Sequence, residues 1–242
     1  MSSDGFFNED VAKTYDQNHG GNDPELIRQT VECLLELSRG GDILEFAIGT
    51  GRIAIPLAQK GASVKGIELS RAMVRRLRQK LGENQIDVTI GDMTSIRVEG
   101  DFSLVFLVFN TIDNLTSQKA QLACFQNAAR HLTHEGRFLV ETQVPPLQRL
   151  PFGETRLAFA NSEHHLGIDE FDIATQNYTS THVWMKDGHQ SRQSIQFRYV
   201  WPSELDLMAM MAGLKLEFRW SAWDRLPFDK LSKKHISVWR KP

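Results

Sequence analysis

The stretch ILEFAIGTGRIA, residues 43–54, decides the fold of this chain. An apolar run ends in Gly49 and Gly51, which one residue separates, and a helical pattern follows. Because glycine has no Cβ and tolerates positive φ, the backbone can turn there and pass close to a ligand. The exposed amides at the start of the following helix would face that ligand. The stretch therefore predicts a strand, a turn and a helix that hold either a phosphate or the carboxylate of an amino-acid cofactor.

Three acidic residues distinguish these two ligands. Glu45 lies late in the first strand, where it would repel a phosphate but can contact the cationic part of an amino-acid cofactor, directly or through water. Glu68 ends the next apolar stretch, 17 residues after Gly51, and an acid at the end of a second strand can accept both ribose hydroxyls. Asp92 follows the short β-branched run 86–90, where it can accept the exocyclic amine of adenine, with Met93 against the ring.

Taken in order, these acids and glycines resemble the motifs of the class I S-adenosylmethionine-dependent methyltransferases. The similarity runs from about Tyr15 to Val144 and again over 213–240, and it is closest to small-molecule enzymes such as the amino-sugar N-methyltransferases. A lone G-x-G-x-x-A motif also occurs in nucleotide-dependent dehydrogenases. Glu45 argues against a dehydrogenase, and the sequence offers no obvious hydride-transfer constellation.

The resemblance implies that S-adenosylmethionine is the cofactor. In relatives a leading segment like 6–16 folds over the cofactor, so Tyr15 would donate its hydroxyl to the methionine carboxylate, and His19 would approach the same end. The alternative for this segment is a mobile terminal arm. The residues implied to bind the cofactor are Tyr15, Glu45, Ala47, Gly49, Thr50, Gly51, Glu68, Leu69, Met73, Asp92, Met93 and Phe109.

Strand and helix patterns alternate along the first 150 residues. We predict strands over 43–48, 62–68, 86–90, 102–109 and 137–144, with helices from 24 to Gly40, over 52–60, after Ser70 and over 118–132. Strands over 214–220 and 235–240 would complete the sheet. The alternation predicts an α/β, doubly wound and mostly parallel sheet, whose ligands lie beyond the carboxyl ends of its strands. The resemblance implies seven strands in a Rossmann-like methyltransferase fold.

The pattern changes after Pro145 and Pro146, where residues 155–201 read as antiparallel strands. Asp187 and Gly188 predict the turn of a hairpin, and apolar and polar residues alternate on both sides of it. We therefore divide the chain into an N-terminal arm and cofactor-binding core (1–150), an antiparallel β insert (151–201) and a closing helix and hairpin (202–242). The insert could be a lid over the substrate, a homodimer surface or a sheet packed on its own domain.

Composition excludes several classes of protein. The net charge of −2 gives no overall attraction to nucleic acid or an anionic membrane, and no apolar run is long enough to span a bilayer. The basic run Arg71–Lys80 lies opposite an apolar helical stripe, which indicates a solvated face. Cys33 and Cys124 lie among apolar neighbours and indicate buried thiols, as in a reducing compartment. With no signal peptide visible, we expect a cytoplasmic protein.

Methyl transfer is an in-line displacement that needs alignment more than acid–base chemistry. Asn110, Asp113 and Asn114 follow the fourth strand, beside the expected position of the methyl group, and are the candidate catalytic residues that bind or orient an acceptor. Asp113 or Asn114 could instead only shape the turn into the next helix. Glu141 could face the pocket or be an ordinary solvated side chain. No histidine or cysteine spacing indicates a metal site.

The sequence thus predicts an enzyme that transfers a methyl group from S-adenosylmethionine to nitrogen or oxygen of a small-molecule acceptor. Two alternatives stay open. One is an RNA or protein methyltransferase with the same cofactor site, although nucleic acid is not the partner that the charge favours. The other is a non-catalytic cofactor-binding scaffold whose insert mediates assembly.

Overall fold

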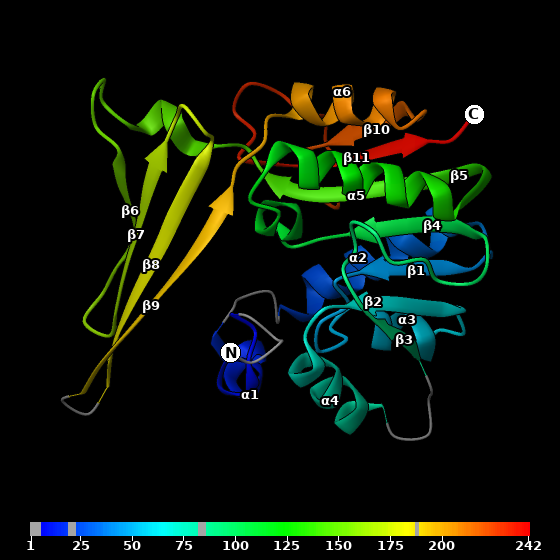
Figure 1. Ribbon diagram of the computed structural model, residues 1–242, viewed down its shortest axis with the longest axis horizontal. Helices are drawn as coiled ribbons and strands as arrows, with labels where there is room; N and C mark the ends of the chain where they lie inside the picture. Colours follow the sequence, from blue (N-terminus) through cyan, green and yellow to red (C-terminus); the bar gives the residue numbers. More distant parts are fainter. Residues whose placement is uncertain (1–5, 19–22, 82–85, 187–188) are drawn as a thin grey trace.

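A mixed sheet forms the centre of the computed structural model, which describes residues 6–18, 23–81, 86–186 and 189–242. Its strand order is β10-β11-β5-β4-β1-β2-β3 (Figure 1). The five strands β1 to β5 are parallel, whereas β11 runs antiparallel to both β5 and β10. The predicted doubly wound, mostly parallel seven-stranded sheet is confirmed. Its strands are β1 Ile43–Phe46, β2 Val64–Glu68, β3 Asp87–Ile90, β4 Phe102–Leu107, β5 Leu132–Gln143, β10 Lys215–Trp220 and β11 Lys234–Arg240.

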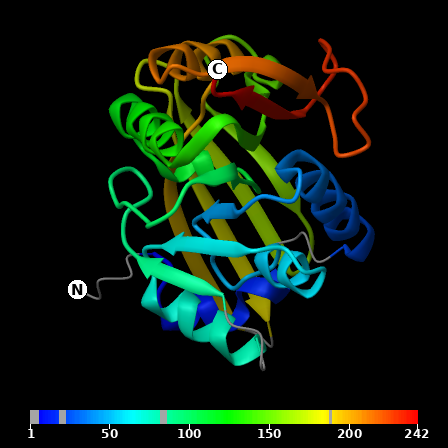
Figure 2. The same cartoon turned by 90° about the vertical axis from the view of Figure 1, so that its right-hand side faces the viewer.

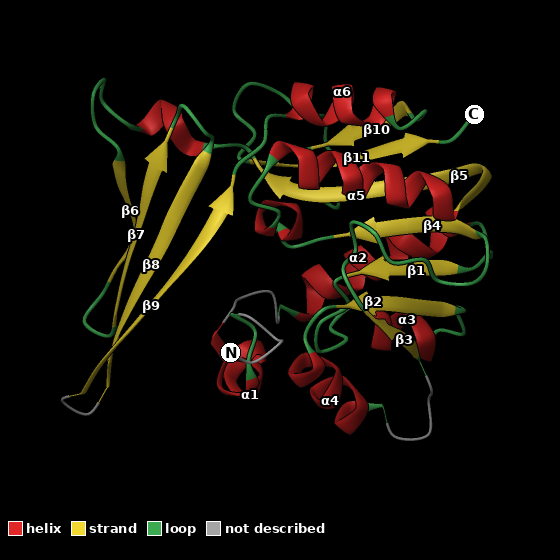
Figure 3. Ribbon diagram, viewed as in Figure 1, coloured by secondary structure: helices red, strands yellow, loops and turns green. Residues whose placement is uncertain are grey.

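Helices cover both faces of this sheet (Figure 3). Alternate strand residues point to opposite faces, so Leu44 and Val105 pack with α5 (Gln118–His131) and α6 (Pro202–Met211). Ile43 and Leu104 pack instead with α2 (Pro24–Ser38), α3 (Ala54–Gln59) and α4 (Arg71–Lys80). Because both faces are covered, the central strands are almost entirely apolar, as parallel sheets require.

Local sequence signals place several of the helix ends. Asp23 accepts a hydrogen bond from the Glu25 amide before α2, and Ser70 accepts one from the Met73 amide in α4. The helix predicted over 52–60 is shorter, because the turn after Gly51 delays its start to Ala54. The prediction that Leu132 ends a helix was wrong, since Leu132 is extended and already pairs with Phe102 of β4.

The insert is a separate antiparallel sheet with strand order β6-β7-β8-β9. Its strands are β6 Arg156–Asn161, β7 His165–Asp172, β8 Asn177–Lys186 and β9 His189–Arg198. It lies behind the core sheet in Figure 2 and leans away from it in Figure 1. The predicted hairpin is confirmed by the β8–β9 pairing, while its turn at residues 187–188 lies outside the described residues. The domain limits at 150 and 201 stay a prediction.

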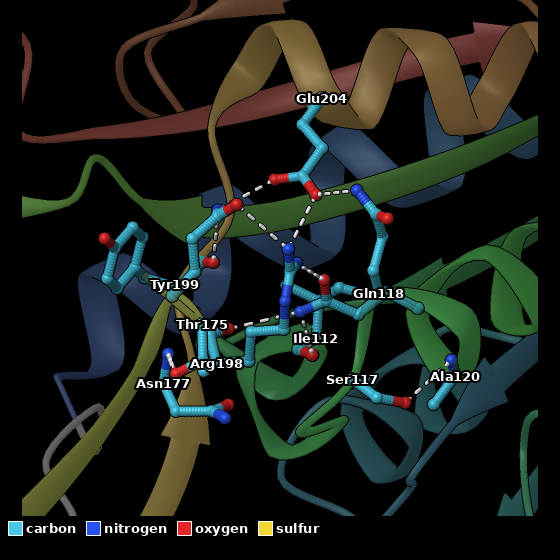
Figure 4. Close-up of polar contacts among 11 residues, drawn as sticks. Ile112, Ser117, Gln118, Ala120, Thr175, Asn177, Arg198, Tyr199 and Glu204 are labelled. Atoms are coloured by element: carbon cyan, nitrogen blue, oxygen red, sulfur yellow. Dashed lines mark hydrogen bonds and ion pairs between the residues drawn. The ribbon is translucent and has the colours of Figure 1, made fainter. Parts of the chain in front are cut away.

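A buried polar cluster joins the insert to the core (Figure 4). The Arg198 side chain, at the end of β9, is 5% exposed and lies 2.8 Å from a Glu204 carboxylate oxygen of α6. Gln118 and Gln176 also donate hydrogen bonds to Glu204, and Arg198 donates to Gln121 and Gln176. The alternation predicted Arg198 on a polar face. Instead its guanidinium is buried, where a charge is tolerated only with partners of this kind.

Candidate active site

The carboxyl ends of β1, β2 and β3 border a cavity of about 330 Å³. Most of the residues that the sequence assigned to the cofactor line it, although they come from segments far apart in the chain. Those residues are Tyr15, Ala47, Gly49, Glu68, Leu69, Met73, Asp92, Met93 and Phe109. Glu45 and Thr50 line an adjoining cavity of about 40 Å³, which shares Tyr15, Ala47, Gly49 and Phe109 with the larger one. Phe7 of the leading segment also borders the larger cavity.

The two glycines of the turn have different surroundings. Gly49 has φ of 58° and donates its amide to Glu68 Oε2 at 2.8 Å, while Glu68 Oε1 accepts the Ser70 amide at 2.8 Å. Glu68 therefore holds the end of β2 against the turn. Gly51 has φ of 80° and lines neither cavity, and a Cβ there would lie 3.0 Å from Ile55 and Leu77 side chains. Its contribution is close packing of the turn on α4.

Glu45 offers a test of whether the small cavity fits the amino-acid end of the cofactor. The side chain is 5% exposed, and its Oε2 has no hydrogen-bond partner among the described residues. Burial, with Glu68 nearby, raises its pKa well above the ordinary value. A buried acceptor without a donor is costly, and a cationic amino group would supply both a donor and a compensating charge. The residues present therefore fit a ligand that carries an ammonium group.

The leading segment closes this edge of the sheet. Helix α1 (Glu9–Asn18) packs on α4, and Thr50 donates its hydroxyl to Asp16 at 2.6 Å. Burial raises the pKa of Tyr15, which keeps its hydroxyl protonated and able to donate. The Arg52 guanidinium lies 4.8 Å from the Phe109 ring centre and 5.4 Å from that of Tyr15. Sequence reasoning missed Arg52. The residue suggested beside Tyr15, His19, lies outside the described residues.

A third cavity, of about 690 Å³, lies between this edge and the insert. The core contributes Asn110, Asn114 and Gln143, and the insert contributes an aromatic and polar wall that includes Tyr178 and Trp184. Four residues line both this cavity and the one of about 330 Å³, namely Phe7, Tyr15, Phe109 and Asn114. The two spaces therefore meet where the predicted transfer of a methyl group would occur.

The three predicted catalytic residues have unlike positions. Asn110 and Asn114 line the large cavity, and Asn110 Oδ1 accepts the Gln143 amide at 2.8 Å. Asp113 is 1% exposed and borders none of the three cavities. It accepts hydrogen bonds of 3.2 Å from Thr142, Gln143 and Tyr178, and burial raises its pKa to about 7. Direct contact with an acceptor stays a prediction for Asn110 and Asn114, whereas Asp113 lies behind Gln143 and Tyr178.

Comparison with known proteins gives the family. A family model described as a methyltransferase domain matches residues 43–136. An uncharacterized methyltransferase of Geobacillus sp. (strain WCH70), GWCH70_2477, is 32% identical over 221 residues, which cover 81% of this chain and 94% of that protein. The structure of the CcbJ methyltransferase from Streptomyces caelestis is 31% identical with a TM-score of 0.87, and the alignment covers 98% of both chains. This chain belongs to the S-adenosylmethionine-dependent methyltransferases.

Other similarities are weaker or shorter. Putative methyltransferase YqeM of Bacillus subtilis (strain 168) is 34% identical over 107 residues, so the alignment spans 43% of either chain. The dTDP-3-amino-3,6-dideoxy-alpha-D-glucopyranose N,N-dimethyltransferase of Streptomyces fradiae is 27% identical over 136 residues, about half of each chain. The S-adenosylmethionine-bound amino pentose methyltransferase CalS10 of Micromonospora echinaspora is 16% identical with a TM-score of 0.73, which shows a shared fold.

Glu141 is a residue of this methyltransferase whose position the sequence left open. It lies in the outer half of β5, is 5% exposed and lines the large cavity, so it is not a solvated side chain. Its Oε2 accepts the Phe109 amide at 3.1 Å, and Lys234 Nζ lies 3.4 Å from Oε1. The sequence signal for a buried Glu141 is its position directly after the apolar run 138–140, near the carboxyl end of β5. Its partners, however, come from the turn after β4 and from β11, which a local pattern cannot show.

Within the described ranges, no group of three or more histidine, cysteine or acidic side chains is arranged to hold a metal ion. No helix in that part of the chain has the length and apolarity that a bilayer crossing requires.

Proposed function

We propose that this methyltransferase transfers the methyl group of S-adenosylmethionine to nitrogen or oxygen of a small-molecule acceptor in the 690 Å³ cavity. The observation that carries the proposal is that the cavities of about 690 Å³ and 330 Å³ meet at Phe7, Tyr15, Phe109 and Asn114. When bound, the cofactor supplies a methyl group on a cationic sulfur, which an acceptor lone pair can displace in line. Holding the two partners in line is worth roughly 7–11 kcal/mol in well-oriented systems.

The chain's own residues would divide the binding between them. Glu68 would accept the ribose hydroxyls, Asp92 the adenine amine, and Glu45 the ammonium of the methionine part. Tyr15 would donate to its carboxylate. Asn110 and Asn114 would hydrogen-bond the acceptor, with Asp113 positioning Gln143 and Tyr178 in the cavity wall.

A small acceptor is favoured by the shape and chemistry of the large cavity. Its walls hold aromatic rings together with charges of both signs, including Arg52, Glu141 and Asp169. That lining suits a compact polar molecule with apolar parts, because a nucleic-acid site would instead carry a basic surface. The Streptomyces fradiae relative, whose name gives an amino sugar as its acceptor, supports an amine. A homodimer through the insert stays a proposal, which sedimentation equilibrium would test.

Calorimetry with S-adenosylhomocysteine tests the cofactor site. Asp92→Ala should weaken binding by about tenfold to a hundredfold, the worth of a hydrogen bond to a charged group. Asp87→Ala, which removes an exposed acid from the start of β3, the strand that precedes Asp92, should leave the affinity unchanged. Labelled methyl transfer to a panel of amino sugars and their hydroxyl analogues then tests the acceptor class. An absence of S-adenosylhomocysteine binding to the wild-type chain would refute the proposal.

A further inference from the structure

The inner face of the insert is an aromatic wall interrupted at its centre by an acid and a serine. Asp169 on β7 pairs with Ser180 on β8, and both line the large cavity. Because side chains two residues apart share a face, the rows on either side follow from the strand register. One neighbouring row holds Phe171, Tyr178 and Phe197, whose stacked rings lie 5.2 Å apart in each adjacent pair.

The row on the other side of Asp169 is aromatic as well. His182 lies there with Phe159, whose ring centre is 5.0 Å away, and beyond it His165 stacks on Trp184 at 3.7 Å. Gly167 makes room for this arrangement, since a Cβ at that position would lie 2.2 Å from the Phe159 ring. Asp169 thus lies between two aromatic rows, whose low polarity strengthens the attraction of its carboxylate for a cation.

Among the described residues, the Asp169 carboxylate has no ion-pair partner. Its side chain accepts a hydrogen bond from the neutral Ser180, and Oδ1 has no hydrogen-bond partner in the part of the chain that the structure describes. No ion pair reaches Asp169 there either. Glu141, the other acid of this cavity, has Lys234 beside it. The cavity therefore holds one neutralised carboxylate on the core side and one uncompensated carboxylate on the insert side.

We propose that Asp169 and the rings around it form a subsite for a cationic amino group of the methyl acceptor. The ammonium donates to Asp169, and the two neighbouring aromatic rows lower the local polarity, which strengthens this charge-assisted hydrogen bond. This inference rests on the proposed function, because the subsite lies in the cavity assigned to the acceptor. Because a protonated nitrogen has no lone pair with which to attack the methyl group, this ammonium binds and orients the acceptor, and Asp169 is a specificity-determining residue that selects acceptors carrying it over their hydroxyl analogues.

Two small probes of matched shape test the subsite without knowledge of the natural acceptor. Benzylammonium and benzyl alcohol are titrated by calorimetry or ligand-observed NMR into the full chain saturated with S-adenosylhomocysteine. We expect benzylammonium to bind at least about tenfold more tightly, as a charge-assisted hydrogen bond predicts. Asp169→Asn should abolish this preference and leave the alcohol's affinity unchanged. Glu170→Gln, on the opposite face of the same strand, should leave both affinities unchanged.

The outcomes separate this inference from the proposed function. If S-adenosylhomocysteine binds but the two probes have equal affinity, or benzylammonium does not bind, the subsite is refuted and the cofactor assignment stands. A preference that persists in Asp169→Asn also refutes the role of Asp169. Should this variant not fold, as judged by circular dichroism, the wild-type comparison of the two probes decides alone.

Discussion

Asp113 predicts an unusual pH dependence of folding stability. Burial raises its pKa from 3.8 to about 7 in the folded protein. The folded state therefore binds this proton more tightly than the unfolded state does. The stabilisation that the proton provides is complete below pH 3.8 and is lost as the pH rises through about 7. Asp113→Asn removes the titrating group and keeps a side chain of the same shape, so the variant should lack this dependence.

The magnitude follows from the difference between the two pKa values. The rise of the Asp113 pKa from 3.8 to about 7 on folding corresponds to about 4 kcal/mol of unfolding free energy. The hydrogen bonds from Thr142, Gln143 and Tyr178 already favour the ionised form, and they are included in that raised pKa. Burial outweighs them because water no longer solvates the charge.

Urea unfolding between pH 4.5 and 8, followed by tryptophan fluorescence, measures the effect. The unfolding free energy of the wild type, relative to Asp113→Asn, should fall as the pH rises to about 7 and level off above it. The unfolding free energy of Asp87→Asn, a change at an exposed position, should vary with pH in the same way as that of the wild type. If the difference between the wild type and Asp113→Asn stays constant with pH, the reasoning about a buried, protonated carboxyl group is refuted.

Three other substitutions test separate parts of the structure. Glu45→Gln should lower S-adenosylmethionine affinity about tenfold or more in calorimetry, because it removes the charge that faces the ammonium, and an unchanged affinity would contradict that contact. Arg198→Met should lower the unfolding free energy by about 1.5–3 kcal/mol, since Glu204, which is 14% exposed, loses a charge-assisted hydrogen bond. The matched Arg156→Met, in an exposed ion pair, should cost about 1 kcal/mol or less, and equal losses would refute the distinction. Gly51→Ala should cost about 1–3 kcal/mol in thermal unfolding, through its positive φ and close neighbours, and a neutral effect would show that the turn can relax.

Much of the core could be predicted because its signals are local. The glycines after β1, the N-cap of α4 at Ser70 and the alternation of strand and helix are each encoded within a few residues. Parallel topology then brings the carboxyl ends of β1, β2 and β3 together. Glu68 and Asp92 consequently line one cavity although the chain separates them.

The remainder depends on contacts between distant segments. Arg198 occupies a position that alternation makes polar, and only packing against α5 and α6 buries it. Arg52 lies between Tyr15 and Phe109, which are far from it along the chain. The start of β5 at Leu132 also depends on a partner strand, because its own sequence continues the apolar pattern of α5.

The route of the chain has a consequence for how this enzyme can diversify. Gln143 of β5 and Lys234 of β11 pair in the core sheet. The chain forms the whole insert between these two residues before it returns to the core sheet at β11. Loop-closure entropy grows only logarithmically, so doubling the length of such an excursion costs about 0.6 kcal/mol. Mutation can therefore lengthen the connections within β6–β9 at little cost in closure entropy, provided that the Arg198 cluster joining the insert to the core is kept. The acceptor cavity can therefore change during evolution while the cofactor-binding edge of the core sheet stays the same.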